Sequence, residues 1–159
     1  MKRIMFVCHG NICRSPMAEF ITKKIVRDLG LGAEYLIRSS ATSYEEQGNP
    51  VYPPARRELA CRGVPLESRC AVRLEPSDYD KYDLFVLMDS RNMRNIKYIF
   101  PSDKDNKICK LLSFAGEDAD VFDPWCSGDF VTAYNDIYRG CVALLCSIDP
   151  RITKSRIIS

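Results

Sequence analysis

The stretch that most constrains the fold of this chain is 7–16, with the sequence VCHGNICRSP. A largely apolar run over residues 3–7 precedes it, which is typical of a strand buried on both faces of a parallel sheet. A helical pattern follows, and Ser15 and Pro16 are typical of an N-cap and a first helical position. Backbone N–H groups at such a strand–helix junction lack helical partners, and the helix dipole favours negative charge there. The stretch therefore predicts an α/β unit with an anion-binding loop after its first strand.

The rest of the chain repeats this alternation of strands and helices. Apolar periodicity and breaker residues predict a first helix over 16–29, further strands over 35–39, 83–88 and 108–112, further helices over 54–62, 90–100 and 130–145, and a helical turn near 77–80. This order indicates an α/β fold with an open, parallel four-stranded sheet flanked by helices on both faces. Ligands bind at the carboxyl ends of the strands in such sheets. Ser39 and Asp89 follow strands, so we expect them to converge with the 8–15 loop.

The first loop carries a thiol and a guanidinium at a suggestive spacing. Cys8 stands at its mouth and Arg14 follows six residues later. A helix N-terminus and a nearby guanidinium favour the reactive thiolate form of a cysteine. The planar fork of an arginine can hold two phosphoryl oxygens, which a lysine cannot do. A buried structural cysteine is the alternative, but Gly10, which allows close backbone approach, and the helix start favour a phosphate cradle with a nucleophile beneath it.

Four segments of the chain resemble one enzyme family. The run CHGNICRSP over 8–16 resembles the signature of the low-molecular-weight protein-tyrosine phosphatases, and 123–125, Asp-Pro-Trp, resembles their general-acid segment. The stretches 39–43 and 88–92 are also similar to the family, so the resemblance spans about residues 2–148. It implies hydrolysis of phosphotyrosine in proteins without cofactor or metal ion. It also implies phosphotyrosine-bearing proteins as partners and phosphate or similar oxyanions as inhibitors.

The resemblance also implies a role for each matched residue. Cys8 would attack phosphorus and form a phosphocysteine, which Arg14 and the loop amides would stabilise. Asp123 would protonate the leaving oxygen and then activate water. Alternatively, the Asp-Pro pair could be an ordinary turn with no catalytic role, and Glu117, Asp118 and Asp120 are rival acids. The phosphate-binding loop would comprise His9, Gly10, Asn11, Ile12, Cys13, Arg14 and Ser15.

Several further residues are expected to support or line this site. Ser15 would donate a hydrogen bond to the Cys8 sulfur, Asn11 would brace the loop with Ser39 as partner, and Asp89 would lie near the pocket. Trp125 and Tyr44 are candidates for the two pocket walls. Cys126 stands where the family commonly has an aromatic residue, which puts regulation by tyrosine phosphorylation there in doubt. The resemblance implies a reversible Cys8–Cys13 disulfide under oxidants, which makes the enzyme redox-sensitive.

Three other functions compete with phosphotyrosine hydrolysis. Protein-arginine phosphatases of the same fold usually carry threonine at the position of Ile12, and an apolar Ile12 suits a flat phenyl ring better. Arsenate reductases need two further cysteines after the strand ending at Met88, and residues 89–108 contain none. A silent phosphate-binding module would lack the nucleophile or the acid, and this chain has both.

Length and composition bound the remaining possibilities. The 159 residues fit a single domain over 1–150 with a basic, flexible C-terminal tail over 151–159. A net charge of +2 gives no field that would favour nucleic acid, and no apolar run approaches the roughly 20 residues of a membrane span. Residues 1–7 do not look like an export signal, so we expect a cytoplasmic protein whose eight cysteines form no disulfide framework. His9 is the only histidine, so we expect no metal site. The substrate protein and the oligomeric state stay open.

Overall fold

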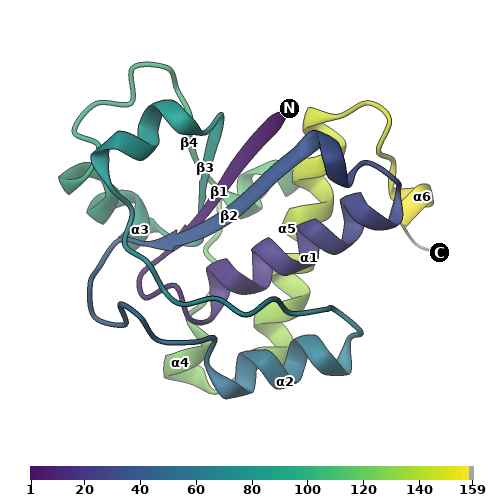
Figure 1. Cartoon of the computed structure of the whole chain (residues 1–159), viewed down its shortest axis with the longest axis horizontal. Coiled ribbons are helices and arrows are strands. Elements are labelled where there is room, and N and C mark those ends of the chain that lie inside the picture. Colours follow the sequence, from purple (N-terminus) through teal and green to yellow (C-terminus); the bar gives the residue numbers. More distant parts are fainter. Residues whose placement is uncertain (158–159) are drawn as a thin grey trace.

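A four-stranded parallel sheet forms the centre of the structure, a computed structural model that describes residues 1–157 (Figure 1). The strand order is β2-β1-β3-β4, with β1 over Lys2–Cys8, β2 over Tyr35–Ala41, β3 over Leu84–Leu87 and β4 over Ile108–Lys110. The central strand β1 pairs with β2 and β3, and all three pairings of the sheet are parallel. The predicted open α/β sheet is therefore confirmed, and Cys8 ends the central strand at its carboxyl edge.

Both faces of β1 are buried, which explains its apolar sequence. Ile4 and Phe6 belong to one hydrophobic cluster, whereas Met5 and Val7 belong to a second. This alternation follows from the strand geometry, in which successive side chains point to opposite faces. The predicted helical cover on both faces is therefore also confirmed.

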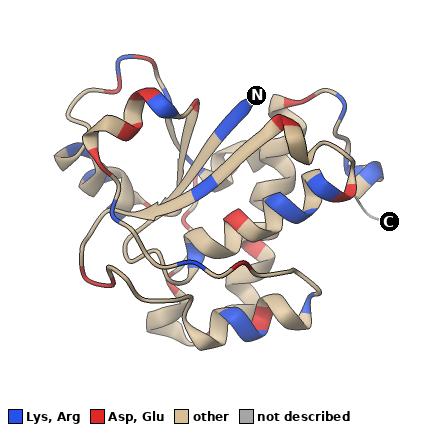
Figure 2. Cartoon of the chain, in the orientation of Figure 1, with Lys and Arg blue, Asp and Glu red and all other residues tan. Residues whose placement is uncertain are grey.

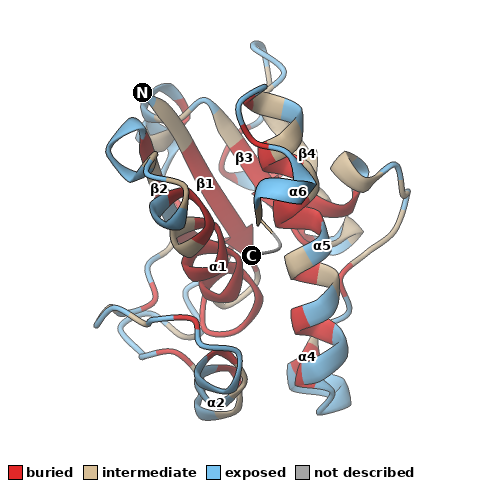
Figure 3. Ribbon diagram, turned by 90° about the vertical axis from the view of Figure 1, so that its right-hand side faces the viewer, coloured by how far each residue is buried: buried red, intermediate tan, exposed pale blue. Residues whose placement is uncertain are grey.

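Helices of unequal size cover the two faces. The first face is covered by α1 (Arg14–Asp28), α2 (Pro53–Cys61) and α5 (Phe130–Ile148), and α1 is buried along most of its length (Figure 3). The second face is covered by α3 (Ser90–Asn95) and the 3-10 turn Ile96–Tyr98 that follows it. Further 3-10 turns span Gly32–Glu34, Pro76–Lys81 and Leu111–Ala115, and two short helices, α4 (Pro124–Ser127) and α6 (Lys154–Ile157), complete the fold.

Charged residues of both signs are interspersed over the helices and loops (Figure 2). On α1, for example, Lys24 pairs with Asp28 one helical turn later. Such exposed pairs contribute little to stability, so the buried faces of the helices carry most of the fold. Within residues 1–157, no helix combines the length and the apolar character needed to cross a membrane.

One helix start and one strand end differ from the predictions, whereas helix α5 begins at Phe130, as its apolar pattern indicated. Helix α1 begins at Arg14, so Ser15 lies inside its first turn instead of capping it. Helix α5 is capped by Asp129, whose side chain accepts a hydrogen bond from the Thr132 N–H. Strand β4 ends at Lys110, before the predicted end at 112. The chain turns there because Leu111 packs against α5 at Gly140, where the missing side chain makes room.

The first residues of the predicted tail are packed on the domain. Ile152 is buried, and Arg151 forms ion pairs with Asp149 at 2.9 Å and with Glu34 at 3.1 Å. A free tail starting at residue 151 therefore does not fit these two residues. For the following residues a flexible tail stays a prediction, and residues 158–159 lie outside the described residues.

Candidate active site

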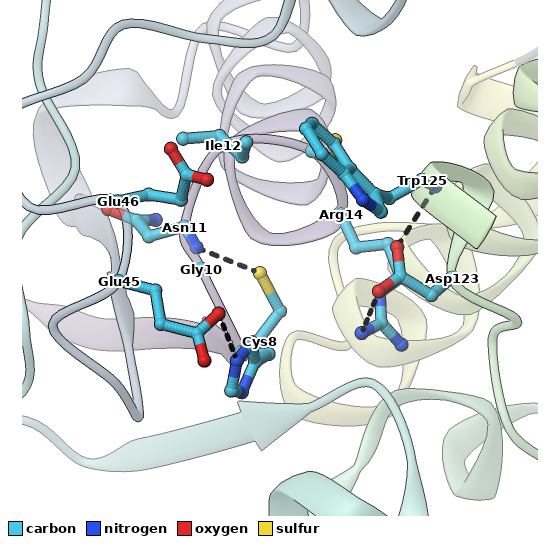
Figure 4. Close-up of a pocket in the computed structure, with 11 residues that line it drawn as sticks. Cys8, Gly10, Asn11, Ile12, Arg14, Glu45, Glu46, Asp123 and Trp125 are labelled. Atoms are coloured by element: carbon cyan, nitrogen blue, oxygen red, sulfur yellow. Dashed lines mark hydrogen bonds and ion pairs between the residues drawn. The ribbon is translucent and has the colours of Figure 1, made fainter.

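The predicted phosphate loop wraps around the Cys8 sulfur at the end of β1. The Sγ atom of Cys8 lies 2.9 Å from the Ser15 hydroxyl and accepts a hydrogen bond from the Asn11 N–H at 3.3 Å. Figure 4 shows this sulfur pointing into a pocket between the Glu45–Glu46 side and the Asp123–Trp125 side. The pocket is lined by residues from three separate segments, Cys8, His9, Gly10, Asn11, Ile12, Cys13, Arg14, Glu45, Glu46, Asp123 and Trp125.

Asn11 braces the loop from within. Its backbone has a φ of 60°, a left-handed conformation that asparagine adopts more readily than most residues. Its side-chain amide donates to the Ser15 hydroxyl at 2.8 Å and to the Ser39 hydroxyl at 3.0 Å. The side chain is completely buried, so these bonds face no competition from water. Asn11 thus ties the loop to α1 and to β2 and aims its own N–H at the Cys8 sulfur.

Arg69 holds Asn11 from the outside and was not anticipated from the sequence. Its guanidinium donates to the Asn11 carbonyl at 2.9 Å and also to the side-chain oxygen of Asn11. Burial lowers the pKa of this guanidinium from its ordinary value, against the opposing effects of Glu19 and Cys8. Arg69 lies in a stretch without secondary structure, so no periodicity marks it.

Arg14 is buried beneath the pocket and has two fixed partners. Its Nη1 donates to the Asp89 carboxylate at 2.7 Å and to the Val121 carbonyl at 2.8 Å. Its Nη2 lies 3.7 Å from the Asp123 carboxylate, beyond hydrogen-bond distance. Burial works to lower the pKa of Arg14, but Cys8, Asp89 and Asp123 together hold it above its ordinary value. A permanent positive charge therefore faces the pocket with Nη2 still available to a ligand.

Asp123 lines the pocket, whereas its three rival acids do not. Its backbone is extended, as expected before a proline, and its Oδ1 accepts a hydrogen bond from the Trp125 N–H at 3.1 Å. This bond caps α4 and leaves Oδ2 directed toward Arg14 (Figure 4). The rival acids are engaged elsewhere, Glu117 with Arg139 and Asp118 and Asp120 with Lys110.

The mouth of the pocket differs in part from the prediction. Trp125 is half-exposed and packs on Tyr52, with ring centroids 4.6 Å apart. Tyr44, the other predicted wall, is not among the lining residues, and its ring packs on the guanidinium of Arg73 instead. The side opposite Trp125 is formed by Glu45 and Glu46.

One of these carboxylates pairs with the loop itself. The carboxylate of Glu45 lies 2.9 Å from Nε2 of His9, and the Ser43 N–H and hydroxyl both donate to the His9 carbonyl. In the structure, His9 is therefore connected to the pocket mouth through its contacts with Glu45 and Ser43. Glu45, Glu46 and Tyr52 were missed because the loop between β2 and α2 has no periodic pattern that fixes side-chain directions.

The remaining predicted residues lie around the pocket floor. Ser39 donates to Glu19 at 2.6 Å, and Glu19 pairs with Lys23 at 2.6 Å, which extends the network along α1. Cys13 is buried and free, and burial, with Cys8 as a further cause, raises its pKa strongly. Among residues 1–157, no group of three or more His, Cys, Asp or Glu side chains is arranged to hold a metal ion.

Comparison with known proteins identifies the family. The family model described as low molecular weight phosphotyrosine protein phosphatase matches residues 3–154. The low molecular weight protein-tyrosine-phosphatase YfkJ of Bacillus subtilis is 31% identical over 150 residues, which cover 93% of this chain and 96% of YfkJ. The α/β fold and the pocket thus define a phosphatase, and the chain belongs to the low-molecular-weight protein-tyrosine phosphatase family.

Solved structures agree with this assignment. The crystal structure of YfkJ matches with a TM-score of 0.89 and covers 96% of this chain and 98% of that one. The low molecular weight protein tyrosine phosphatase SP-PTP from Streptococcus pyogenes matches at 33% identity and a TM-score of 0.84, covering 98% of this chain and 96% of that one. A Drosophila arginine phosphatase matches at 27% identity and a TM-score of 0.84, covering 94% and 98%. The fold alone therefore does not distinguish a phosphatase that acts on phosphotyrosine from one that acts on phosphoarginine.

Proposed function

We propose that this protein hydrolyses phosphotyrosine in proteins through a phosphocysteine intermediate on Cys8. The observation that carries the proposal is the meeting of three groups in one pocket: the Cys8 sulfur, the free side of the Arg14 guanidinium and the Asp123 carboxylate. A thiol, a fixed cation and a carboxyl group are the nucleophile, the charge stabiliser and the acid–base group that phosphoryl transfer requires.

The first step transfers the phosphoryl group to sulfur. The Cys8 thiolate, held by the Ser15 hydroxyl and the Asn11 N–H, attacks phosphorus in line with the leaving oxygen. The S–P bond forms as the P–O bond to tyrosine breaks. Asp123 gives its proton to the leaving phenolate, and Arg14 with the loop amides stabilises the charge on the equatorial oxygens.

The second step regenerates the enzyme. The Asp123 carboxylate takes a proton from a water molecule, which attacks phosphorus on the side that tyrosine has left. The S–P bond breaks, inorganic phosphate departs, and Cys8 returns to the thiolate. Because phosphate is the product, we expect phosphate and similar oxyanions to inhibit by occupying the same cradle.

Two of the side chains that line the pocket favour tyrosine over arginine as the phosphorylated residue. Ile12 lines the pocket with an apolar side chain, and the exposed ring of Trp125 stands on another side of it. These groups complement a flat phenyl ring, whereas neither side chain can accept a hydrogen bond from a guanidinium.

The free state of all eight cysteines fits a reducing compartment, which supports our proposal of a cytoplasmic protein.

A paired assay tests the proposal. Phosphate release is measured from a phosphotyrosine peptide and from a phosphoarginine peptide of the same sequence, each with EDTA and each with the Cys8→Ser variant as control. We expect release from the tyrosine peptide that EDTA does not affect and that the variant abolishes. Release from the arginine peptide alone would refute the substrate and leave the mechanism, and release from neither peptide by folded protein would refute both.

We also propose that mild peroxide joins Cys8 and Cys13 reversibly. Peroxide would oxidise the Cys8 thiolate to a sulfenic acid with loss of hydroxide, and the Cys13 sulfur would then displace water to form the disulfide. Both thiols are buried and belong to the same loop, which supports their pairing. Mass spectrometry after mild peroxide treatment should find the 8–13 disulfide, and recovery of Cys8 only as sulfinic or sulfonic acid would refute it.

A further inference from the structure

A charged cluster lies outside the set of residues that line the pocket. It consists of Lys110, the last residue of β4, with Asp120 and Ser90. The Lys110 Nζ lies 3.0 Å from the Asp120 carboxylate and 3.3 Å from the Ser90 hydroxyl. The same Asp120 oxygen accepts hydrogen bonds from the Ser90 N–H at 3.1 Å and from the Ser90 hydroxyl at 3.2 Å. We call this cluster the Lys110 clamp.

Ser90 and Asp120 are each adjacent in the sequence to a partner of Arg14. Ser90 follows Asp89, whose carboxylate accepts the Arg14 hydrogen bond at 2.7 Å. Asp120 precedes Val121, whose carbonyl accepts the other bond from the same Nη1 at 2.8 Å. The clamp therefore holds both partners of Arg14 in place, because each partner is the chain neighbour of a clamp residue.

The clamp also acts on the segment that carries the proposed acid. Asp123 follows Asp120 by three residues, and the intervening Val121 is fully buried and donates its N–H to the Met88 carbonyl at 2.8 Å. Within residues 1–157, the hydrogen bonds to Asp123 all come from its own helix: its side chain accepts the Trp125 N–H, and its carbonyl accepts the Cys126 and Ser127 N–H groups. Its position thus depends on how firmly the preceding residues are held to the sheet.

We propose that Lys110 is a positioning residue. Through Asp120 and Ser90 it holds the segment that carries Asp123 and the two partners of Arg14 in fixed positions relative to each other. This inference rests on the proposed roles of Asp123 and Arg14. Lys110 touches neither the pocket nor the substrate and acts only through the two segments that it joins.

The charges in the clamp are organised to favour the paired state. The hydrogen bond to Asp120 raises the pKa of Lys110 against the effect of burial, and Asp118 at 3.3 Å adds to it. Burial works to raise the pKa of Asp120, but the contacts with Lys110 and Ser90 hold it below its usual value. Without the ammonium group, the partly buried Asp120 carboxylate would lose its ion pair, and the segment before Asp123 would shift.

A displaced acid has a specific kinetic signature. An aryl phosphate with a strongly basic leaving oxygen, such as phenyl phosphate, needs the proton from Asp123, whereas 4-nitrophenyl phosphate releases a weakly basic phenolate and needs it less. The ratio of kcat/KM for the two substrates therefore reports on the acid, since kcat/KM includes the step in which the P–O bond breaks. A merely destabilised protein would lose activity toward both equally.

We expect Lys110→Met to lower kcat/KM for phenyl phosphate about tenfold and for 4-nitrophenyl phosphate about twofold, part of the roughly 10²–10⁴-fold that a general acid contributes. Lys110→Arg, which keeps the positive charge, should restore most of the loss. Lys104→Met is the matched control, because Lys104 is exposed and has no ion pair among residues 1–157, and it should change neither value. Equal losses on both substrates, or no loss, would overturn the proposal.

A second readout does not depend on activity. Trp125 is the only tryptophan, lies two residues after Asp123 and packs on Tyr52 at 4.6 Å. Acrylamide should quench its fluorescence more strongly in Lys110→Met than in wild type or Lys104→Met, because the released segment loses this contact. Unchanged quenching in folded Lys110→Met would refute the positioning role of Lys110. This test holds even if wild type is inactive on aryl phosphates, a separate result that would refute the proposed function. Should Lys110→Met fail to fold, the same two readouts are applied to Ser90→Ala.

Discussion

Position 140 in α5 is expected to reject even a methyl group. A Cβ atom placed on Gly140 would lie 2.4 Å from Cγ of Leu111 and 2.9 Å from its Cδ2. Carbon atoms in contact are normally about 3.5–4.0 Å apart. Leu111 is completely buried, so it has little room to turn away. The Gly140→Ala change therefore pushes α5 away from the segment that follows β4, next to Lys110.

The magnitude follows from two opposing effects. In a helix without such a contact, replacing glycine by alanine stabilises by about 1 kcal/mol. Overpacking a well-filled core costs about 1–3 kcal/mol, and a separation of 2.4 Å belongs at the upper end of that range. We expect the free energy of unfolding to fall by about 2 kcal/mol, which corresponds to a fall in Tm of about 4–8 °C for a chain of this size.

Urea denaturation followed by far-UV circular dichroism measures this change. Asn135→Ala, on an exposed position of the same helix, is the control for helix propensity and should stabilise by about 0.5 kcal/mol. In a Leu111→Ala background, Gly140→Ala should become stabilising, because the added methyl group then enters free space. A Gly140→Ala protein as stable as wild type, or an equal cost in both backgrounds, would refute the reasoning.

Three further predictions concern charge and thiol chemistry. The pKa of Asp149 lies below its usual value because of hydrogen bonds from Arg151 and Tyr35. Its stabilising effect is thus complete above the pKa of an unfolded aspartate, about 3.9, and is lost as the pH falls further. Asp149→Asn should therefore flatten the acid limb of a stability–pH curve, and an unchanged limb would contradict this. Arg14→Lys should lower kcat/KM about 10²–10³-fold in folded protein, because lysine lacks the planar fork, and a loss under tenfold would count against that role. Burial raises the pKa of Cys141 to about 12, so mass spectrometry should find it unmodified after brief iodoacetamide treatment that labels the exposed Cys61, Cys70 and Cys126, and early labelling of Cys141 would be the contrary result.

The parts of the fold that repeat regularly were predictable from the sequence. The alternation of Ile4 and Phe6 with Met5 and Val7 between two cores is the direct result of a strand buried on both faces. The carboxyl ends of parallel strands share one edge, so the convergence of Cys8, Ser39 and Asp89 followed from the parallel arrangement of the strands alone. These inferences rest on periodicity, which the backbone imposes.

The parts that depend on how loops dock were not predictable in the same way. Both Tyr44 and Tyr52 lie between β2 and α2, yet Tyr52 packs on Trp125 while Tyr44 packs on Arg73. No local pattern separates them, because an irregular loop does not set side-chain directions by a fixed period. Arg69 was missed for the same reason, since its role depends on a contact with Asn11 far away in the sequence.

Arg14 distributes its hydrogen bonds in a way that separates the two carboxylates around it. Asp89 holds Nη1 at 2.7 Å and also caps α3 by accepting the Asn92 N–H at 2.7 Å, so it is committed to the scaffold. Asp123 lies 3.7 Å from Nη2, too far for a hydrogen bond, on a segment that ends in the short helix α4. A phosphate that binds Nη2 would therefore leave the Asp89 contact intact and displace only the weaker interaction with Asp123. Because of this difference in distance, one carboxylate fixes the guanidinium while the other makes no hydrogen bond to it, which is what the proposed acid–base role of Asp123 requires.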